Sequence, residues 1–375
     1  MRLPRKAAGC KNALPLRALS MMQSISISDW MARTGALPLA DVRTPAEFAQ
    51  GHIPGAFNVP LFSNEERVQV GTTYKQVSRE EAILLGFELT GPKWAGFIRQ
   101  CLQIAPDKRI AVHCWRGGMR SGAMAWALNL YGFEVYQVTG GYKSYRRWAH
   151  LQFERAYKLR ILGGMTGSGK TRLLQYMKAQ EHQVIDLEEL AQHRGSSYGS
   201  LDKLIQPTQE QFENNLAWEL NQVCTEVPLW LEDECQMIGR RSIPTPLWKQ
   251  MRAAVLIGLQ VPLEQRVATL VQDYGCLDRD FLVACTERIH KRLGPLQTKQ
   301  AIAAIREGRM ADFIRLVLVY YDKAYRKGLA LHPADRVFLL EVSGNNTAAD
   351  SRRLIALITE DQDPRPGNDG PDIPE

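Results

Sequence analysis

The sequence predicts an α/β protein with two domains, each built around a parallel sheet. The chain has 375 residues, which is long for one hydrophobic core and ordinary for two. Hydrophobic residues make up 45% of the composition, enough to give each domain a core. Two glycine-bearing loops each follow an apolar segment and precede a helical one, and this order of strand, loop and helix is typical of parallel α/β folds.

The chain from residue 24 to residue 97 supplies the first elements of the N-terminal domain. We expect a short strand that ends at 41–43, a helix around Glu47 and a second strand at 56–59. The segment 63–97 is longer than a simple connection requires. It predicts either a variable surface insertion or a segment that contacts the substrate.

The loop after the apolar segment 109–113 carries the candidate nucleophile, Cys114. A thiol at the junction of a strand and a helix faces backbone N–H groups and the positive end of the helix, and Arg116 and Arg120 follow closely. These features lower the pKa of a thiol and bind anions. The alternative is a buried cysteine at a strand end that has no chemical role. We favour the reactive interpretation, with Cys114, Arg116 and Arg120 as catalytic candidates.

Several short motifs place this cysteine in a known family of domains. Asp41-Val-Arg43, Gly51-His-Ile-Pro-Gly-Ala56 and the glycine turn at 140–142 surround Cys114 in the order expected for a rhodanese domain, which this region resembles. Arg120 lies six positions after Cys114, one more than in the commoner sulfurtransferase loop. The larger loop resembles the phosphatase branch of the fold, so it leaves both a phosphate-bearing donor and phosphoester cleavage open.

A second loop, at the start of the C-terminal domain, has the sequence Gly164-Met-Thr-Gly-Ser-Gly-Lys-Thr171. It matches the P-loop pattern in the required context, after a strand and before a helix. Backbone N–H groups from Gly167 to Lys170 are expected to surround a diphosphate, whose charge Lys170 neutralises. Thr171 is a possible ligand of Mg²⁺. The candidate binding residues in this loop are Gly164, Gly167, Ser168, Gly169, Lys170 and Thr171.

Further strands are expected at 183–186, 229–231 and 254–261, which predicts a P-loop NTPase-like parallel α/β domain. Asp186 and the group from Glu232 to Glu234 follow two of these strands, and acids at such positions beside a phosphate loop hold a metal ion or a water molecule. The pattern does not indicate which acid does so. We therefore assign no metal ligand and count Asp186, Glu232 and Asp233 among the residues that bind the phosphate compound.

Charge and composition limit the function classes. The net charge is +7 and the pI is about 9.0, which favours a polyanionic partner such as nucleic acid. No apolar segment is long enough to span a bilayer, and the seven cysteines form no CxxC pair, so we expect a cytoplasmic protein without a membrane partner. Basic residues are frequent in the segment 143–158 and at later positions, where they predict either solvated helix faces or contacts with RNA. At the later positions a lid over the bound phosphate is a further alternative. The later positions are Arg240, Arg241, Lys249, Arg252, Arg288, Lys291 and Arg292.

The two motifs together resemble the tRNA 2-selenouridine synthase family over residues 24–345. The matching segments are His113–Ser121, the P-loop, 186–196 and 230–240. The expected organisation is a disordered extension at 1–23, a rhodanese-like domain at 24–142, a basic connecting helix at 143–158, a P-loop domain at 159–345 and a C-terminal segment at 346–375 that ends in a disordered acidic tail.

This resemblance implies a transferase that acts on 2-thiouridine at the wobble position in the anticodon arm of tRNAs for Lys, Glu and Gln. The implied reaction first attaches a geranyl group from geranyl diphosphate to sulfur and then replaces the S-geranyl group using selenophosphate. Selenophosphate synthetase is a possible source of the selenophosphate. The P-loop would hold the diphosphate, and Cys114 would accept selenium as a Cys–Se intermediate with Arg116 and Arg120 beside it.

Two other functions remain open at this point. In one, the P-loop binds ATP to activate the base, and a Cys114 persulfide supplies sulfur. In the other, the rhodanese-like domain is a phosphatase or a binding module.

Overall fold

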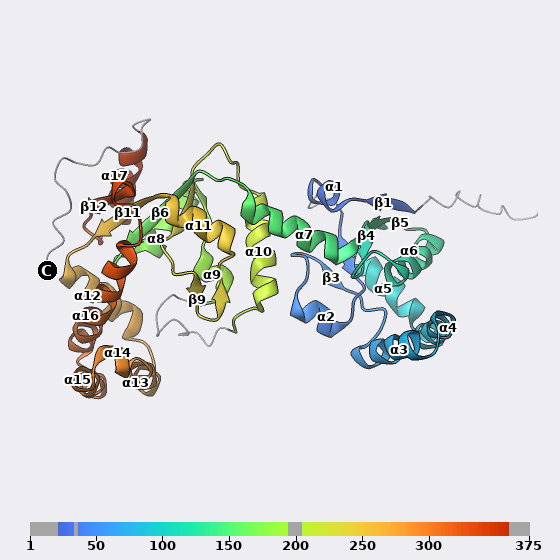
Figure 1. Ribbon diagram of the computed structural model, residues 1–375, viewed down its shortest axis with the longest axis horizontal. Helices are drawn as coiled ribbons and strands as arrows, with labels where there is room; N and C mark the ends of the chain where they lie inside the picture. The colour runs from blue at the N-terminus through green and yellow to red at the C-terminus, as the bar shows by residue number, and fades with distance from the viewer. Residues whose placement is uncertain (1–21, 34–36, 194–204, 360–375) are drawn as a thin grey trace, which may run out of the picture. The chain divides into compact units, whose positions relative to one another are not determined.

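The computed structural model describes residues 22–33, 37–193 and 205–359. The chain divides into two compact units between Trp148 and Ala149, so that helix α7 (Gly141–Glu154) belongs partly to each (Figure 1). The sequence predicted this helix at 143–158. In the structure it begins two residues earlier, where Tyr142 is fully buried in unit 1, and it ends at Glu154.

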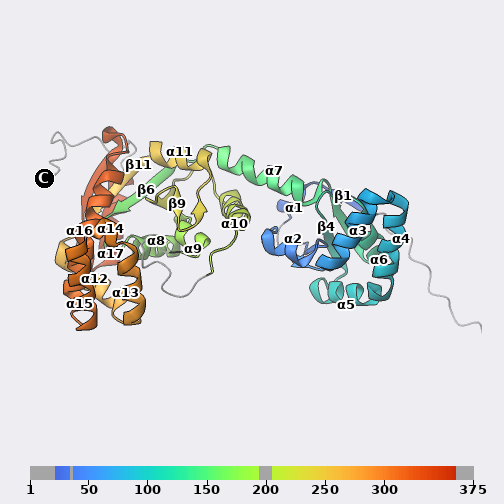
Figure 2. The same ribbon diagram turned by 60° about the horizontal axis from the view of Figure 1, so that its bottom comes forward.

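Unit 1 is a five-stranded parallel sheet with the strand order β1-β5-β4-β2-β3, surrounded by helices (Figures 1 and 2). The α/β fold that the sequence predicts for this domain is confirmed. Its elements before α7 are β1 (Gln23–Ile25), α1 (Ile27–Met31), β2 (Leu39–Asp41), α2 (Pro45–Gln50), β3 (Phe57–Asn58), α3 (Asn64–Gln76), α4 (Arg79–Thr90), the 3-10 turn Gly91–Lys93, α5 (Trp94–Ile104), β4 (Arg109–His113), α6 (Met119–Tyr131) and β5 (Glu134–Val138).

The sequence predicted either a surface insertion or a substrate-contacting segment at 63–97. In the structure this segment forms mainly two helices, α3 and α4, which lie side by side (Figures 1 and 2). Helix α3 begins at a capping box. The Ser63 hydroxyl accepts a hydrogen bond from the backbone N–H of Glu66, and the Glu66 carboxylate accepts one from the backbone N–H of Ser63. The Glu66 carboxylate also pairs with Lys93, which ties the start of α3 to the turn before α5.

Unit 2 is a second five-stranded parallel sheet, with the order β12-β11-β6-β8-β7. This confirms the predicted parallel α/β domain. Its elements are β6 (Leu159–Gly164), α8 (Lys170–Ala179), β7 (Gln183–Val184), α9 (Leu187–Ala191), α10 (Gln209–Asn221), β8 (Leu229–Glu232), β9 (Met237–Ile238), β10 (Arg241–Ser242), α11 (Thr245–Ala253), β11 (Val255–Gln260), α12 (Leu263–Tyr274), α13 (Arg279–Arg288), α14 (His290–Leu293), α15 (Pro295–Arg306), α16 (Met310–Leu329), the 3-10 turn Ala334–Arg336, β12 (Val337–Glu341) and α17 (Thr347–Thr359).

Hydrophobic clusters of buried residues stabilise the described part of unit 2. A cluster at the sheet includes Leu162, Leu174, Ile257 and Leu354, so that α17 packs against α8. Another cluster lies among helices α12 to α16 and includes Phe313 and Ile314. Helix α17 falls in the segment 346–375, and the predicted acidic tail after it lies outside the described residues, as does nearly all of the predicted extension at 1–23. No helix among the described residues is both long and apolar enough to cross a lipid bilayer.

The close approach of a glycine turn to the Cys114 loop gives a prediction about stability. Gly141 has φ +57°, and a Cβ there would lie closer to the Cys114 carbonyl oxygen than real Cβ atoms approach other atoms. Gly55 also has a positive φ, +78°, but a Cβ there would meet no atom within 4 Å. We therefore expect Gly55→Ala to lower the free energy of unfolding by about 1 kcal/mol, from backbone strain alone.

The same change at Gly141 adds a steric clash to the backbone strain, so we expect a loss of about 3 kcal/mol or more. Thermal and urea denaturation of the two variants measures both values. Equal losses would mean that the turn at Gly141 can move away from the loop without cost.

Candidate functional site

The first candidate site lies where β4 ends in the middle of the sheet of unit 1. Cys114 follows β4 directly, residues 115–118 bend over it, and α6 begins at Met119. The Cys114 side chain is only 4% exposed, and its Sγ lies 3.3 Å from the Ser121 Oγ in the first turn of α6. The predicted sequence of strand, loop and helix therefore places the thiol at the start of a helix.

The surroundings of Cys114 favour the thiolate. Burial by itself raises the pKa of this thiol, but hydrogen bonds from the Ser121 side chain and from the backbone N–H groups of Ser121 and Arg116, together with the charge of Arg120, outweigh it. The pKa of Cys114 is therefore below its ordinary value. In contrast, burial without such partners raises the pKa of Cys101 to about 12. The geometry supports a reactive thiol over an inert strand-end cysteine.

Hydrogen bonds from two neighbouring elements hold the loop in place. The Gln137 side chain, at the end of β5, donates from its Nε2 to the Gly117 carbonyl oxygen at 2.8 Å and to the Ser121 Oγ at 3.0 Å. At the start of α7, the backbone N–H of Tyr142 donates to the Cys114 carbonyl oxygen at 2.9 Å, and that of Lys143 to the Trp115 carbonyl oxygen at 3.0 Å. The loop is therefore fixed before any substrate binds.

The two arginines proposed as catalytic differ in their surroundings. Arg120 is mostly buried and forms a bidentate ion pair with Glu47, with Nη1–Oε2 and Nη2–Oε1 distances of 2.6 and 3.1 Å. Although burial raises the pKa of Glu47, the contact with Arg120 brings it below its ordinary value, so the pair stays charged. Arg116 is exposed on the outer side of the loop. The sequence identified Glu47 only as a helix residue, because the Arg120 contact joins positions 73 residues apart.

A buried charged group lies beneath the loop. Arg43 is 1% exposed and forms a bidentate ion pair with Asp41, and its guanidinium also stacks over the Tyr142 ring at 3.7 Å. His113, also buried, approaches the same carboxylate with its Nε2 at 3.6 Å. Burial lowers the pKa of His113, which favours the neutral imidazole. The Asp-x-Arg motif therefore supports the loop through Tyr142, whose backbone N–H donates to the Cys114 carbonyl oxygen.

The second candidate site is the P-loop of unit 2, which connects β6 to α8. Lys170 Nζ donates to the Gly164 carbonyl oxygen at 2.8 Å and lies 3.4 Å from a Glu232 carboxylate oxygen. The Thr171 hydroxyl donates to the other oxygen of Glu232 at 3.3 Å. Gly169, with φ +79°, forms the N-terminal cap of α8 without a side-chain hydrogen bond. The first N–H groups of the helix therefore have no side-chain cap, as a phosphate site requires.

A cavity of about 470 Å³ opens over this loop. Five of the six candidate P-loop residues line it, from Gly167 to Thr171, and so does Asp186. Gly164 and Glu232 do not line the cavity, but both contact Lys170, which does. Other lining residues, which the sequence analysis did not select as site residues, are Arg172, Gln175, Glu188, Glu189, Gln192 and His193 near the loop and Thr269, Leu270 and Asp273 on α12.

Asp233 is placed differently from its neighbour Glu232. Its carboxylate accepts hydrogen bonds from Arg252 Nη1 at 3.3 Å and from His332 Nε2 at 3.2 Å, and it does not line the cavity. Successive residues at a strand end point to opposite sides, so only one of the two acids can face the P-loop. Arg252, one of the basic candidates for RNA contact or a lid, is held in this group and also donates to the Gly328 carbonyl oxygen.

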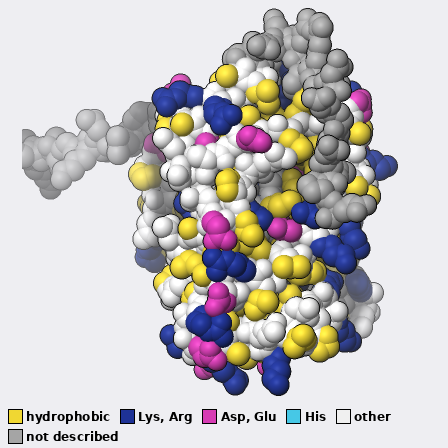
Figure 3. All heavy atoms as spheres, turned by 90° about the vertical axis from the view of Figure 1, so that its left-hand side faces the viewer, with side chains coloured by type: hydrophobic (Ala, Val, Ile, Leu, Met, Phe, Trp, Pro, Cys, Tyr) yellow, Lys and Arg dark blue, Asp and Glu magenta, His cyan; other side chains and the backbone are white. Residues whose placement is uncertain are grey.

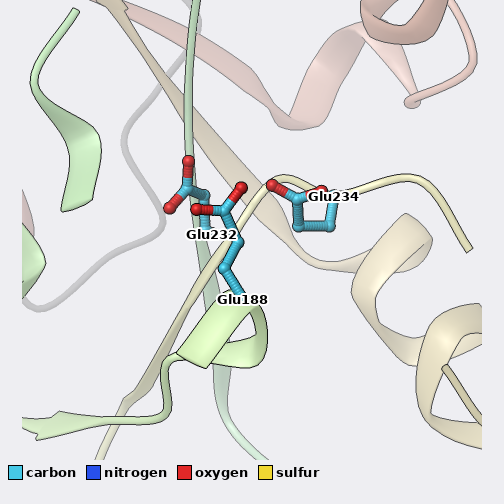
Figure 4. A group of neighbouring side chains, drawn as sticks. All are labelled: Glu188, Glu232 and Glu234. Carbon is cyan, nitrogen blue, oxygen red and sulfur yellow. The ribbon is translucent and has the colours of Figure 1, made fainter. Parts of the chain in front are cut away.

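Three acidic side chains converge beside Lys170 and Thr171. Figure 4 shows Glu188 rising from α9 and Glu232 and Glu234 reaching from the end of β8 and the segment after it. One carboxylate oxygen from each lies within 4.8 Å of the others. Burial, reinforced by charge repulsion from neighbouring acids, raises the pKa of Glu232 and of Glu234. The sequence analysis placed Glu232 and Glu234 in one acidic group but did not select Glu188, which comes from a separate helix.

The basic residues of the later helices form no continuous positive surface in the view of Figure 3, which faces the helices at the left of Figure 1. Lys and Arg side chains there are interspersed with Asp and Glu side chains. Ion pairs also join charges of α12, α16 and the residue before α16, as in Arg315 with Glu264 and Arg309 with Asp312. This pattern favours solvated helix faces over an RNA-binding surface at this part of the molecule.

Comparisons with known proteins match both units. Residues 26–147 match a family model described as a rhodanese-like domain, and residues 157–343 match one described as a tRNA 2-selenouridine synthase AAA domain. Curated relatives named tRNA 2-selenouridine synthase are similar over most of the chain. The relative from Marinobacter nauticus is 37% identical over 77% of this chain and 87% of its own length, and that from Shewanella loihica is 35% identical over 80% and 89%.

A relative of the same name from Nitrosomonas europaea is 39% identical over 63% of this chain. That match spans 63% of the relative, which is less than two thirds of its length.

The contact between Cys114 and Ser121 gives a prediction about pH dependence. Because Ser121 favours the thiolate, Ser121→Ala is expected to move the deprotonation of Cys114 to higher pH. The pH profile of iodoacetamide alkylation, followed by mass spectrometry of the Cys114 peptide, measures this midpoint, since the thiolate is the nucleophile. The Cys101 peptide in the same sample is the control and should stay unreactive, because its pKa is about 12. An unchanged midpoint would exclude Ser121 as the stabilising donor.

Proposed function

Because the chain belongs to the tRNA 2-selenouridine synthase family, we propose that it converts 2-thiouridine at the wobble position of tRNAs for Lys, Glu and Gln to 2-selenouridine. The observation that carries this proposal is the presence, on one chain, of a thiol with a lowered pKa and an open diphosphate loop. Selenophosphate and geranyl diphosphate are the proposed co-substrates. Both compounds carry phosphate oxygens, which the N–H groups at the start of a helix bind well.

In the first step, a geranyl group is transferred from geranyl diphosphate to the thiocarbonyl sulfur of the base. The sulfur–carbon bond forms as the carbon–oxygen bond breaks, and negative charge develops on the departing diphosphate. Lys170 and the N–H groups at the start of α8 are placed to stabilise that charge. Lys170 would exchange its contacts with Gly164 and Glu232 for contacts with the diphosphate.

The acidic side chains beside this loop fit a divalent cation such as Mg²⁺. Carboxylate and hydroxyl oxygens are the ligands that Mg²⁺ prefers, and Thr171, Glu232 and Asp186 supply them near the diphosphate position. Burial, reinforced by repulsion from Asp186, raises the pKa of Glu232, and a bound cation would favour its charged form again. Its chemical contribution would be to neutralise charge on the diphosphate as it leaves.

The second step replaces the S-geranyl group with selenium. Alkylation makes the ring carbon more electrophilic and turns the sulfur into a thiol that can depart. The resemblance implies a Cys–Se intermediate, which would require Cys114 to attack the selenium of selenophosphate. That attack leaves the electron pair of the P–Se bond on phosphorus and reduces it to phosphite.

Attack by Cys114 on phosphorus avoids this reduction. The S–P bond forms, the P–Se bond breaks and selenium leaves with the electron pair as hydrogen selenide, which displaces geranyl thiol from the base. Water then releases phosphate from Cys114. We propose this route because its electrons balance without an added oxidant or reductant, and because Arg120 and the loop N–H groups suit the oxygens of a phosphoryl group. Phosphorus NMR distinguishes the routes, since one yields phosphate and the other phosphite.

Variants at the two sites should separate the two steps. Cys114→Ala removes the nucleophile, so we expect selenation to be lost while S-geranylated tRNA accumulates. Lys170→Ala removes the charge beside the diphosphate, and we expect geranylation to fall at least a hundredfold. Both products are measured by mass spectrometry of nucleosides after thiolated tRNA is incubated with the protein, geranyl diphosphate and selenophosphate.

Matched controls use exposed residues of the same types. Cys276→Ala and Lys299→Ala should leave both products at wild-type levels, since Cys276 and Lys299 lie on the surface of unit 2. The proposed division of labour fails if Cys114→Ala abolishes geranylation yet selenates tRNA that was geranylated beforehand. Turnover of a simple aryl phosphate that depends on Cys114, without tRNA modification, would support the phosphatase alternative.

Ligand protection tests which phosphate compound the P-loop binds. A ligand that binds only the folded protein raises the melting temperature by mass action. We expect geranyl diphosphate to raise the melting temperature of the wild type, and Lys170→Ala to abolish most of the increase. Protection by ATP in its place would support the ATP-dependent sulfurtransferase.

A further inference from the structure

Trp115 is an exposed aromatic residue in the loop of the candidate nucleophile. It directly follows Cys114, so the two Cα atoms are about 3.8 Å apart. The side chain of Cys114 is almost fully buried, whereas Trp115 is 38% exposed. A tryptophan gains free energy by burying its rings, so an exposed one beside a reactive atom is a candidate binding surface.

The position of Trp115 is fixed by buried neighbours. Its ring lies against the Tyr142 ring, with the centroids 5.7 Å apart and the planes tilted by 47°. Tyr142 is fully buried and carries the Arg43 guanidinium 3.7 Å from its own ring centroid. The Trp115 carbonyl oxygen accepts a hydrogen bond from the backbone N–H of Lys143. One side of the indole is therefore supported by the buried Tyr142, and 38% of the residue is open to solvent.

Exposed basic residues are neighbours of Trp115 in the chain and in the fold. Arg116 follows it in the loop, and the backbone N–H of Lys143 donates to its carbonyl oxygen. The side chains of Arg116 and Lys143 are both exposed. Arg147, one turn further along α7, places its guanidinium beside Gly140, in the turn that packs under the loop. An aromatic ring flanked by cations is the combination that binds single-stranded nucleic acid, because bases stack on the ring and phosphates contact the cations.

We propose that Trp115 is the stacking platform for the target pyrimidine of the RNA and holds the base next to Cys114. Arg116 and Lys143 contact the phosphates that flank this base. The proposal rests on the proposed function for the identity of the substrate. It adds a substrate-binding residue, because the base must leave its own stack before its C2 atom can meet the hydrogen selenide released beside Cys114, and an aromatic surface at that place replaces the lost stacking.

The test uses an anticodon stem–loop that carries S-geranyl-2-thiouridine at the wobble position, with selenophosphate as the second substrate. In Trp115→Ala, we expect the KM for the stem–loop to rise about tenfold, since the base loses its stacking partner. The KM for selenophosphate should not change. Trp115→Phe keeps an aromatic ring and should restore most of the affinity. Trp126→Ala is the matched control, since Trp126 is 57% exposed on α6 in the same unit.

Two further measurements separate binding from folding and from turnover. The rate of iodoacetamide alkylation of Cys114 should be the same in Trp115→Ala and the wild type, which shows that the loop is intact. Quenching of tryptophan fluorescence by the stem–loop should be weakened in Trp115→Ala and retained in Trp126→Ala. This titration needs no catalysis, so it tests the platform even if the proposed reaction is wrong.

The proposal is overturned if Trp115→Ala binds the stem–loop as tightly as the wild type does. It is also overturned if the alkylation rate of Cys114 changes in Trp115→Ala in parallel with the KM, because Trp115 would then act only by shaping the loop. If the stem–loop binds through Trp115 but no selenouridine forms, the platform stands and the proposed function fails.

Discussion

Both candidate sites depend on backbone N–H groups at the start of a helix whose N-terminal cap is a glycine. Gly118 is the cap of α6 and Gly169 that of α8, and neither glycine offers a side-chain acceptor. By contrast, Thr44, Ser63 and Asp186 cap their helices with an oxygen atom. These N–H groups need another hydrogen-bond acceptor. An anion is the best one, because the positive end of the helix dipole also lies at the start of the helix. In α6 the Cys114 sulfur is one such acceptor, and in α8 the cavity leaves room for phosphate.

The two sites differ in how firmly each holds its positively charged side chain. Arg120 is held by Glu47 and stays at the edge of the thiol loop, so the loop keeps one fixed positive charge. Lys170 is held less firmly, by one carbonyl oxygen and one longer carboxylate contact. A diphosphate carries more charge than either partner and can displace both. Unit 1 is therefore preorganised around its nucleophile, whereas unit 2 must rearrange one side chain to bind.

Much of this arrangement follows from local sequence. The strand, loop and helix around Cys114 and the P-loop around Lys170 are contiguous patterns, and apolar periodicity with glycine is sufficient to predict them. Contacts between distant segments could not be read in this way. Glu47 meets Arg120, and Glu188 joins Glu232, only because the carboxyl ends of parallel strands meet at one edge of each sheet. Asp233 and Glu232 are neighbours in sequence, yet opposite orientations at the strand end give them different partners. The residue-level roles in the two sites remain predictions.

The buried start of α7 determines how the molecule can be divided. Tyr142 and Lys143 hold the backbone of the cysteine loop, and Tyr145 lies in the core of unit 1, although the same helix continues into unit 2. A fragment ending at Gly140, where the last strand and its turn are complete, would therefore lack the support for its own nucleophile. A recombinant N-terminal fragment should include Trp148, and loss of thiol reactivity in a shorter one would reflect missing scaffold and say nothing about chemistry.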